Sequence, residues 1–384
     1  MAAMSATGII VEFNPFHNGH KIHIDETRQR TGSGIIAAMS GNFVQRGEPA
    51  ICDKWRRTKM ALLCRVDIVV EIPVPYVVCG ADYFARGSVG VLAATGVVDA
   101  ISFGSECGDL AAIMEAGKIL AEESAPYKKH LRDGMDNGLS FASAKGAALA
   151  AILPNAPEGL LNQPNNVLAM EYCKALHLLG NPMEVFTTHR QKGGASATKI
   201  RKNLSDVEGQ MPKACEEILL DACEKGEVAT LDDFSDIFRY LLYTEELTLG
   251  EGLQNRFRKF AISHKKISHL LADVKTKRYT HTRLQRMVLQ VLLGINDNDM
   301  ANVRPPYVRV LGFRKEAEKL LGEMTKKASV PVITHGAAID EMLAQDGVAA
   351  KMLAKELEVG DIYRLATSQG GGYRSERGTA VVVV

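Results

Sequence analysis

The chain has 384 residues, of which 46% are hydrophobic, and its 46 lysines and arginines nearly balance 45 aspartates and glutamates. This length predicts two or three domains with a substantial core, and the near-neutral balance excludes a uniformly basic protein, so any nucleic-acid surface must be local. No apolar run reaches 18 residues, residues 1–7 lack the pattern of a signal peptide, and the seven cysteines form no CxxC pair, so we expect a soluble, cytoplasmic protein with reduced thiols and no membrane contact.

Short apolar runs alternate with helical patterns along the first half of the chain. Their continuous apolar character is typical of strands that are buried on both faces of a sheet. We predict strands at 8–13, 34–40, 67–72, 99–103 and 184–188, and helices at 21–30, 53–64, 83–94, 109–123, 141–152 and 166–179. This alternation predicts an α/β fold with a doubly wound parallel sheet.

The first predicted strand leads through Glu12-Phe-Asn-Pro-Phe-His-Asn-Gly-His20 into the first predicted helix. In an open parallel sheet, ligands bind at the carboxyl ends of strands, and a helix N-terminus favours an anion. Gly19 has no Cβ and lets phosphate oxygens approach the backbone. His17 and His20 can donate hydrogen bonds to a pyrophosphate leaving group without a permanent charge. The pattern favours a nucleoside triphosphate site over a structural corner with two surface histidines.

Other polar stretches follow the later predicted strands. Arg46 and the basic cluster Lys54, Arg56 and Arg57 can meet phosphates or a substrate carboxylate, or can form a solvated helix face. Gly104 is expected to lie close to an adenosine, unless it belongs to an ordinary strand-to-helix turn, and Asn165 is expected to be an N-cap, an amide that reads a base, or both.

A second phosphate cradle is predicted after the fifth strand. Arg190 follows this strand, and Ser196, Thr198 and Arg201 lie at the start of a short predicted helix. Hydroxyl groups, a helix N-terminus and an arginine together suit phosphate oxygens. We expect the cradle and the two histidines to hold the β- and γ-phosphates.

After about residue 201 the strand signal fades and helical periodicity dominates. We therefore predict an ATP-binding catalytic domain at residues 1–205 and a mainly helical, basic domain at residues 206–384. The 31 residues from Arg256 to Arg286 carry ten basic side chains against one acid, Asp273, a net charge of +9. The basic residues are Arg256, Arg258, Lys259, Lys265, Lys266, Lys275, Lys277, Arg278, Arg283 and Arg286.

This charge predicts polyanion binding. The interleaved Phe257, Phe260 and Tyr279 can stack on unpaired RNA bases. The alternative is a basic helical surface whose aromatic side chains lie in the core. We favour RNA.

The motifs His-x-Gly-His and Ser-x-Thr-x-x-Arg together resemble the HIGH-type nucleotidylyltransferase superfamily. The fuller strings at 11–20, 39–49, 101–106, 164–166 and 196–201 resemble one branch of it, the tRNA(Met) cytidine acetate ligase family. The resemblance is dense over the first 200 residues and thinner through 304–313 and 361–363. Two departures are mild: Phe13 stands where the family often has Tyr, and Arg65-Val-Asp67 replaces a more usual Gly-Ala-Asp.

The resemblance implies that ATP and acetate form acetyl-adenylate and pyrophosphate, and that the acetyl group passes to N4 of the wobble cytidine of elongator tRNA(Met). It implies catalytic roles for His17, His20 and Arg201. It also implies an ATP site made of Ile10, Val11, Glu12, Phe13, Asn14, Pro15, Phe16, His17, Asn18, Gly19, His20, Lys21, Ile22, His23, Gly104, Asn165 and Arg190. The phosphate cradle predicted above adds Ser196 and Thr198 to this site. We expect Mg²⁺ to be bound mainly through phosphates. His20 and His23 lack a third ligand nearby, so we predict no metal held by the protein alone, and no obligate protein partner is evident.

Two alternatives remain open. One is a nucleotidylyltransferase that acts on a small phosphorylated metabolite such as nicotinamide mononucleotide, which needs only the first 200 residues. The other is an RNA-binding protein that retains an ATP pocket without catalysis. The general base for the cytidine amino group is also open, with Asp53, Asp67 and Glu106 as candidates.

Overall fold

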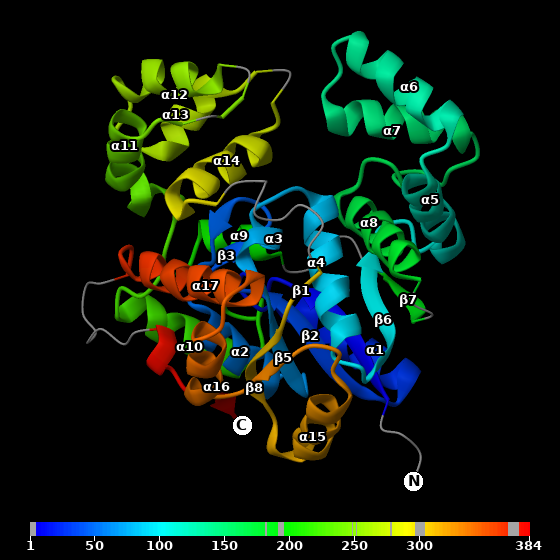
Figure 1. Ribbon diagram of the computed structural model, residues 1–384, viewed down its shortest axis with the longest axis vertical. Coiled ribbons are helices and arrows are strands. Elements are labelled where there is room, and N and C mark those ends of the chain that lie inside the picture. The colour runs from blue at the N-terminus through cyan, green and yellow to red at the C-terminus, as the bar shows by residue number, and fades with distance from the viewer. Residues whose placement is uncertain are drawn as a thin grey trace.

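The computed structural model describes residues 5–180, 183–190, 196–247, 249–250, 252–276, 279–295, 304–367 and 376–384. Within these residues a central sheet holds β1 (Ala6–Val11), β2 (Gly34–Ser40), β5 (Ile68–Ile72), β6 (Val98–Ser105), β7 (Glu184–His189), β8 (Val308–Phe313), β9 (Val332–Ile333) and β10 (Val382–Val383). Its order is β10-β8-β5-β2-β1-β6-β7, with β9 beside β8 (Figure 1). β1, β2, β5, β6 and β7 pair in parallel with one another, whereas β8 runs antiparallel to β5. The predicted α/β class is confirmed.

Helices cover both faces of the sheet. Alternate residues of a strand point to opposite faces, so Ile36 and Ala38 of β2 pack on one side while Ile35 and Ala37 pack on the other. The first face is covered by α4 (Ala81–Ala94), α5 (Leu110–Glu122) and α8 (Pro164–Leu179). The second is covered by α1 (Asn18–Thr31), α2 (Lys54–Leu63) and α10 (Lys213–Glu224). Five predicted strands and six predicted helices are confirmed to within a few residues.

A helical module forms a second core. We use this name for residues 229–295, which contain the 3₁₀ turn η1 (Leu231–Phe234) and helices α11 (Ser235–Thr244), α12 (Leu253–Ala261), α13 (Ile267–Val274) and α14 (His281–Leu293). Its core includes Phe238, Phe257 and Leu271, and it continues into Phe43 and Tyr363, which lie outside the module. Shared apolar packing therefore joins the module to the rest of the fold.

The packing does not follow the predicted division at residue 205. The chain after the module returns to the sheet as β8, β9 and β10, and α10 packs on the sheet through Cys215 and Leu219. The remaining elements there are η3 (Lys315–Ala317), α15 (Glu318–Lys327), α16 (Gly336–Leu343), α17 (Val348–Arg364) and η4 (Glu376–Gly378). The boundary between 205 and 206 stays a prediction, and by packing we propose that 229–295 is the separate unit.

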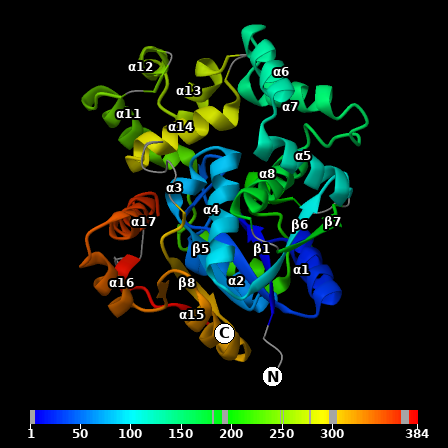
Figure 2. The same cartoon turned by 45° about the vertical axis from the view of Figure 1, so that its right-hand side comes forward.

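Two helical groups lie above the sheet in Figures 1 and 2, and the C-terminus lies at its lower edge. One group is the helical module, and the other is a hairpin of α6 (Ala125–Asp136) and α7 (Phe141–Ile152). β1 begins at the lower edge of the sheet in these views, so its carboxyl end points toward these groups. In the described part of the chain, no helix is long and apolar enough to cross a membrane.

Candidate active site

The order of the strands reverses between β1 and β6. The chain passes from β1 to β2 on one side, and after β5 it crosses to β6 on the other side of β1. Ligands of open α/β sheets bind at such a reversal, outside the carboxyl ends of the strands. The loop at residues 12–17 follows β1 and leads into α1, and Gly104 lies near the end of β6. Topology therefore brings both predicted parts of the ATP site to one place.

The loop after β1 is held by hydrogen bonds from three distant segments. The Asn14 side chain accepts the Ile51 N–H (2.7 Å), and the Asn14 carbonyl accepts an N–H of Arg201 (2.6 Å). The Glu12 carbonyl accepts an N–H of Arg57 (2.6 Å). Phe13 has a φ of 47°, in the left-handed region that costs a non-glycine residue energy. These contacts hold the loop in one shape before any ligand binds.

His17 and His20 cap the N-terminus of α1 and stack on each other. Nδ1 of His17 accepts the Gly19 N–H (3.0 Å), and Nδ1 of His20 accepts the His17 N–H (3.2 Å). The two ring centroids are 3.7 Å apart. Since Nδ1 is the acceptor in both rings, each neutral imidazole carries its proton on Nε2. The site therefore presents two adjacent Nε2–H donors.

Burial keeps these histidines neutral. Burial, with a smaller contribution from the Arg190 guanidinium, lowers the pKa of His17 to about 4. Burial, followed by the neighbouring His17 and Arg190, holds the pKa of His20 well below its usual value. Burial also lowers the pKa of His23 to about 4, and Nε2 of this residue lies 3.0 Å from Ser102 Oγ on β6. At neutral pH the pair therefore donates hydrogen bonds without repelling the nearby arginine.

This depression of the pKa predicts a specific titration. A histidine that is more acidic in the folded state than in the unfolded state stabilises the fold fully above its unfolded pKa, and this contribution is lost as the pH falls through the folded pKa. We expect the Cε1–H NMR signal of His17 in the ligand-free protein to titrate near pH 4. We also expect the free energy of unfolding to decrease between pH 6.5 and 4. A His17 midpoint near the ordinary value would contradict this account.

Hydrogen bonds connect Glu106, directly after β6, to the first turn of α8. Glu106 Oε1 accepts from the Asn165 side-chain amide (2.6 Å), and Glu106 Oε2 accepts the Asn166 N–H (2.9 Å). Asn166 Oδ1 in turn accepts the Glu106 N–H (2.8 Å). The predicted N-cap role of Asn165 is wrong, because α8 begins at Pro164 and the Glu106 carboxylate supplies the cap. Sequence reasoning missed Glu106 in this role because the two segments are about 60 residues apart.

The predicted cradle lies beside the loop. The backbone N–H of Arg190 donates to the carbonyl of Ser105 (2.9 Å) at the end of β6. Ser196 caps α9 (Ala197–Lys202) by accepting the Lys199 N–H (3.2 Å), and Thr198 is exposed on the first turn of this helix. Arg201, besides its bond to Asn14, pairs with Glu48 (3.2 Å). The cradle and the loop are thus joined through one arginine.

The three side chains of the predicted basic cluster are bound to other groups of the fold. Lys54 is buried and pairs with Glu71 (2.7 Å), while Arg57 is buried and donates to backbone carbonyls. Arg56 pairs with Asp53 and Glu227. The interpretation of Lys54, Arg56 and Arg57 as phosphate ligands is wrong, because Lys54 and Arg56 are paired with carboxylates and the Arg57 guanidinium donates to buried backbone carbonyls.

The three candidate general bases have structural partners. Asp53 caps α2 by accepting the Trp55 N–H (2.8 Å), and Asp67 accepts the Ile35 N–H (2.7 Å). Glu106 caps α8. These carboxylates stabilise local structure, and none of these bonds assigns a base.

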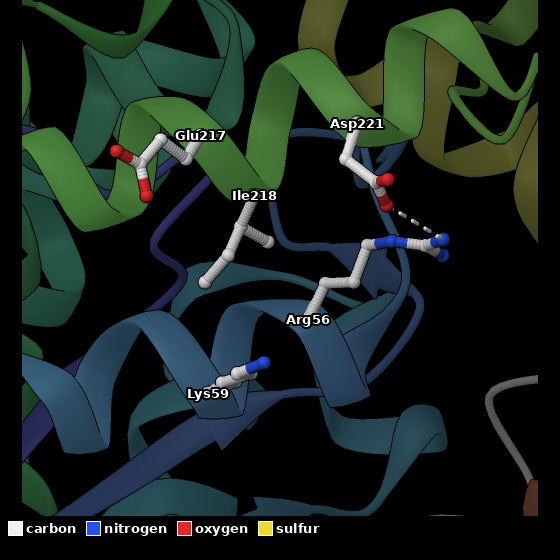
Figure 3. Close-up of a pocket in the computed structure, with 5 residues that line it drawn as sticks. All are labelled: Arg56, Lys59, Glu217, Ile218 and Asp221. Atoms are coloured by element: carbon white, nitrogen blue, oxygen red, sulfur yellow. Dashed lines mark ion pairs between the residues drawn. The ribbon is translucent and has the colours of Figure 1, made fainter.

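A surface depression of about 330 Å³ lies between α2 and α10. Arg56 and Lys59 of α2 face Glu217 and Asp221 of α10 across it, and Arg56 pairs with Asp221 at 3.9 Å (Figure 3). None of its lining residues belongs to the predicted ATP site. Its positive and negative charges compensate each other, so it offers no charge for an anion.

The described basic side chains of this region are either half-buried or exposed. Arg256 donates to the Val274 carbonyl (2.8 Å) and Arg258 to the Leu242 carbonyl (2.8 Å), so these two side chains satisfy helix ends. Arg286 is half-buried and donates to the Gln45 carbonyl (3.3 Å). Five basic side chains are exposed: Lys259, Lys265, Lys266, Lys275 and Arg283. Lys277 and Arg278 lie outside the described residues.

The predicted stacking aromatics are mostly in the core. Phe257 is fully buried and Tyr279 is 7% exposed. The interpretation of these two side chains as base-stacking platforms is wrong, because Leu253, Phe257 and Ala261 recur at the helical spacing and line the buried face of α12. Phe260 is half-buried and lies under the Arg256 guanidinium, 5.1 Å from the ring centroid.

No group of three or more His, Cys, Asp or Glu side chains that could hold a metal ion occurs in the described ranges. Magnesium that bridges ATP phosphates needs few protein ligands. The two neutral histidines and the arginines suit the phosphates themselves.

Comparisons with known proteins identify the family of this chain. Residues 4–377 match the HIGH nucleotidyl transferase family. The chain is 40% identical to the tRNA(Met) cytidine acetate ligase of Thermoanaerobacter sp. (strain X514), over 94% of this chain and 96% of that protein. It is 38% identical to the same-named protein of Clostridium kluyveri, over 91% and 94% of the two chains.

A crystal structure of Thermotoga maritima TmcAL bound with alpha-thio ATP superposes with a TM-score of 0.93 at 30% identity, covering 99% of this chain and all of that chain. The apo form of the same protein gives a TM-score of 0.91. The resemblance seen in the motifs is thereby confirmed. The chain belongs to the HIGH nucleotidyl transferase family and, within it, to the tRNA(Met) cytidine acetate ligases.

Proposed function

We propose that this chain activates acetate with ATP and acetylates N4 of the wobble cytidine of elongator tRNA(Met). The observation that carries the proposal is the pair of neutral Nε2–H donors at the carboxyl ends of β1 and β6, in a chain that belongs to this family. Relatives named for this reaction match over nearly the whole chain. We also propose that the protein acts in the cytoplasm without an obligate protein partner.

In the first step a carboxylate oxygen of acetate attacks the α-phosphorus of ATP, and the bond to the pyrophosphate oxygen breaks. Positioning and charge stabilisation supply most of the rate acceleration in such transfers. We assign His17 and His20 to the oxygens of the leaving pyrophosphate, because their Nε2–H groups donate without prior protonation. Arg190, Ser196, Thr198 and Arg201 surround the same phosphates in this proposal. Mg²⁺ bound to the phosphates would offset their negative charge.

In the second step the amino nitrogen of cytidine attacks the acetyl carbonyl carbon, and AMP leaves. The cytidine nitrogen loses one proton in the process. An acyl-adenylate is already activated, so a weak base is sufficient.

Acetate-dependent exchange between pyrophosphate and ATP tests the first step. The proposal predicts that acetate alone supports exchange by the purified chain, with no coenzyme A present. A strict requirement for acetyl-coenzyme A would contradict it.

Gly104 offers a test of the adenosine position. A Cβ built at Gly104 meets nothing closer than Thr188 Oγ1 at 3.9 Å, so Gly104→Ala should leave the melting temperature unchanged. If the nucleotide approaches this backbone closely, the added methyl group should weaken ATP binding by about tenfold. Isothermal titration of both proteins with ATP measures the difference. Equal affinities would remove Gly104 from the site.

The exposed lysines of the helical module provide the RNA test. We expect Lys265→Gln, Lys266→Gln and Lys275→Gln together to raise the KM for tRNA by about tenfold or more and to reduce the salt dependence of binding, because each lysine releases counterions from phosphates. The rate of acetate-dependent exchange should not change. Lys319→Gln, Lys326→Gln and Lys327→Gln on α15, at the opposite end of the molecule (Figure 1), form the matched control. Equal effects of the two triple variants would exclude a specific role for the module.

A further inference from the structure

A two-stranded hairpin connects the helical module with the loop after β1 (residues 12–17), which we call the ATP loop. Its strands are β3 (Phe43–Val44) and β4 (Glu48–Pro49), which pair antiparallel outside the main sheet. Glu48 is bonded on both sides: Oε2 pairs with Arg201 at 3.2 Å, and Oε1 accepts from the Gln285 side-chain amide of α14 at 3.1 Å. Arg201 continues the connection to the Asn14 carbonyl. One carboxylate therefore joins the module to the cradle and the loop.

A second connection runs through the hairpin backbone. The Gln45 N–H donates to the Glu12 carboxylate (2.6 Å), and the Gln45 carbonyl accepts from Arg286 of α14 (3.3 Å). Glu12 directly follows β1 at the start of the ATP loop. The neighbouring residues Gln285 and Arg286 thus contact the two sides of the turn of this hairpin.

The hairpin fits closely against α14. Gly47 has a φ of 85°, and a Cβ there would lie 2.6 Å from the Arg286 backbone nitrogen and 2.6 Å from Gln285 Cβ. Only glycine permits this approach. Gln285 is 8% exposed, and a buried amide is costly unless it is hydrogen-bonded. This contact therefore fixes the position of Glu48 relative to the module.

We propose that Gln285 is a positioning residue for the ATP site, acting through Glu48 on Arg201. The catalytic consequence rests on the function proposed above, in which Arg201 holds ATP phosphates. Without Gln285, Glu48 loses one of its two restraints and holds Arg201 less precisely against the loop. The helical module then contributes to acetate activation itself, before any RNA binds.

The test compares Gln285→Ala with Gln290→Ala in the full-length protein without RNA. Gln290 is a matched control, because it lies on the same helix and its side-chain amide also donates to a group outside the module. The acceptor is the Val78 carbonyl (3.2 Å), which is not part of the hairpin. We expect Gln285→Ala to weaken ATP binding about tenfold and to lower kcat/KM for exchange by at least as much. Gln290→Ala should leave both unchanged, whatever it does to the melting temperature.

A double variant separates positioning from a loss of stability. If Gln285 acts through Glu48, adding Gln285→Ala to Glu48→Ala should cause no further loss of ATP affinity. Independent, additive effects, or a Gln285→Ala protein that behaves as Gln290→Ala does, would overturn the proposal. ATP affinity is measured without acetate, so an unaltered chain that binds ATP but shows no exchange would contradict the proposed function and leave this test intact.

Discussion

Replacing His17 by Asn should lower kcat/KM for acetate-dependent exchange by about 10²-fold to 10³-fold, the loss found when one preorganised donor is removed from a developing negative charge. Asparagine is a favourable N-cap, so its carbonyl oxygen can still accept the Gly19 N–H that His17 Nδ1 accepts. The Nε2–H donor, in contrast, is lost. The expected result is a folded protein with little activity, measured by exchange kinetics beside a thermal melt.

His335→Asn is the matched control for this variant. His335 caps α16 in the same way, with Nδ1 accepting the Ala338 N–H (3.3 Å), but it has no place in the proposed chemistry. We expect its exchange rate to equal that of the unaltered protein. A loss of less than about threefold in His17→Asn would show that the imidazole serves only as a cap.

Replacing Arg57 by Met should lower the free energy of unfolding by about 3 to 5 kcal/mol, because buried acceptors would lose a charged donor. The Arg57 guanidinium is fully buried and donates to the carbonyls of Cys52 (3.1 Å) and Ser40 (3.1 Å), and also to those of Glu12 and Gly41. These carbonyls belong to the ends of β1 and β2 and the segments that follow them. Urea unfolding measures the loss.

Arg56→Lys on the same helix should change the free energy of unfolding by less than about 1 kcal/mol, since its partners are carboxylates at the protein surface. Because Arg57 also holds the Glu12 carbonyl, we expect the Arg57→Met protein to bind ATP more weakly at temperatures where it is still folded. Equal stability of the two variants would contradict the role assigned to Arg57.

Local pattern was sufficient to predict the parallel part of the sheet. Runs such as Ile35 to Met39 are buried on both faces, so their apolar character is continuous and visible in the sequence. β8 was not predicted, because its apolar run is interrupted by Arg309. This arginine is buried and pairs with Glu71 (3.1 Å) and Glu376 (3.3 Å), partners that lie far away in the sequence. A charge that is compensated only by tertiary contacts resembles a surface charge in the sequence.

The same limit applies at the site. The motif around His17 and His20 predicted a strand, a loop and a helix N-terminus, and the structure has all three. The tautomer of the histidines depends on backbone contacts, which the sequence does not show. The partners of Arg201 lie 153 and 187 residues away in the sequence, and those of Arg57 are backbone carbonyls, which every residue carries. The sequence therefore shows how many basic residues are present, but not which of them bind a ligand and which donate hydrogen bonds within the fold.

The most direct test of the central claim is the fate of labelled acetate. The purified chain is incubated with ATP, Mg²⁺, labelled acetate and bulk tRNA, and the nucleosides of the recovered tRNA are separated. The account predicts label in N4-acetylcytidine, from elongator tRNA(Met), and no label with the His20→Ala protein. Label that enters acetyl-adenylate but never RNA, or a product that forms equally well with His20→Ala, would contradict it.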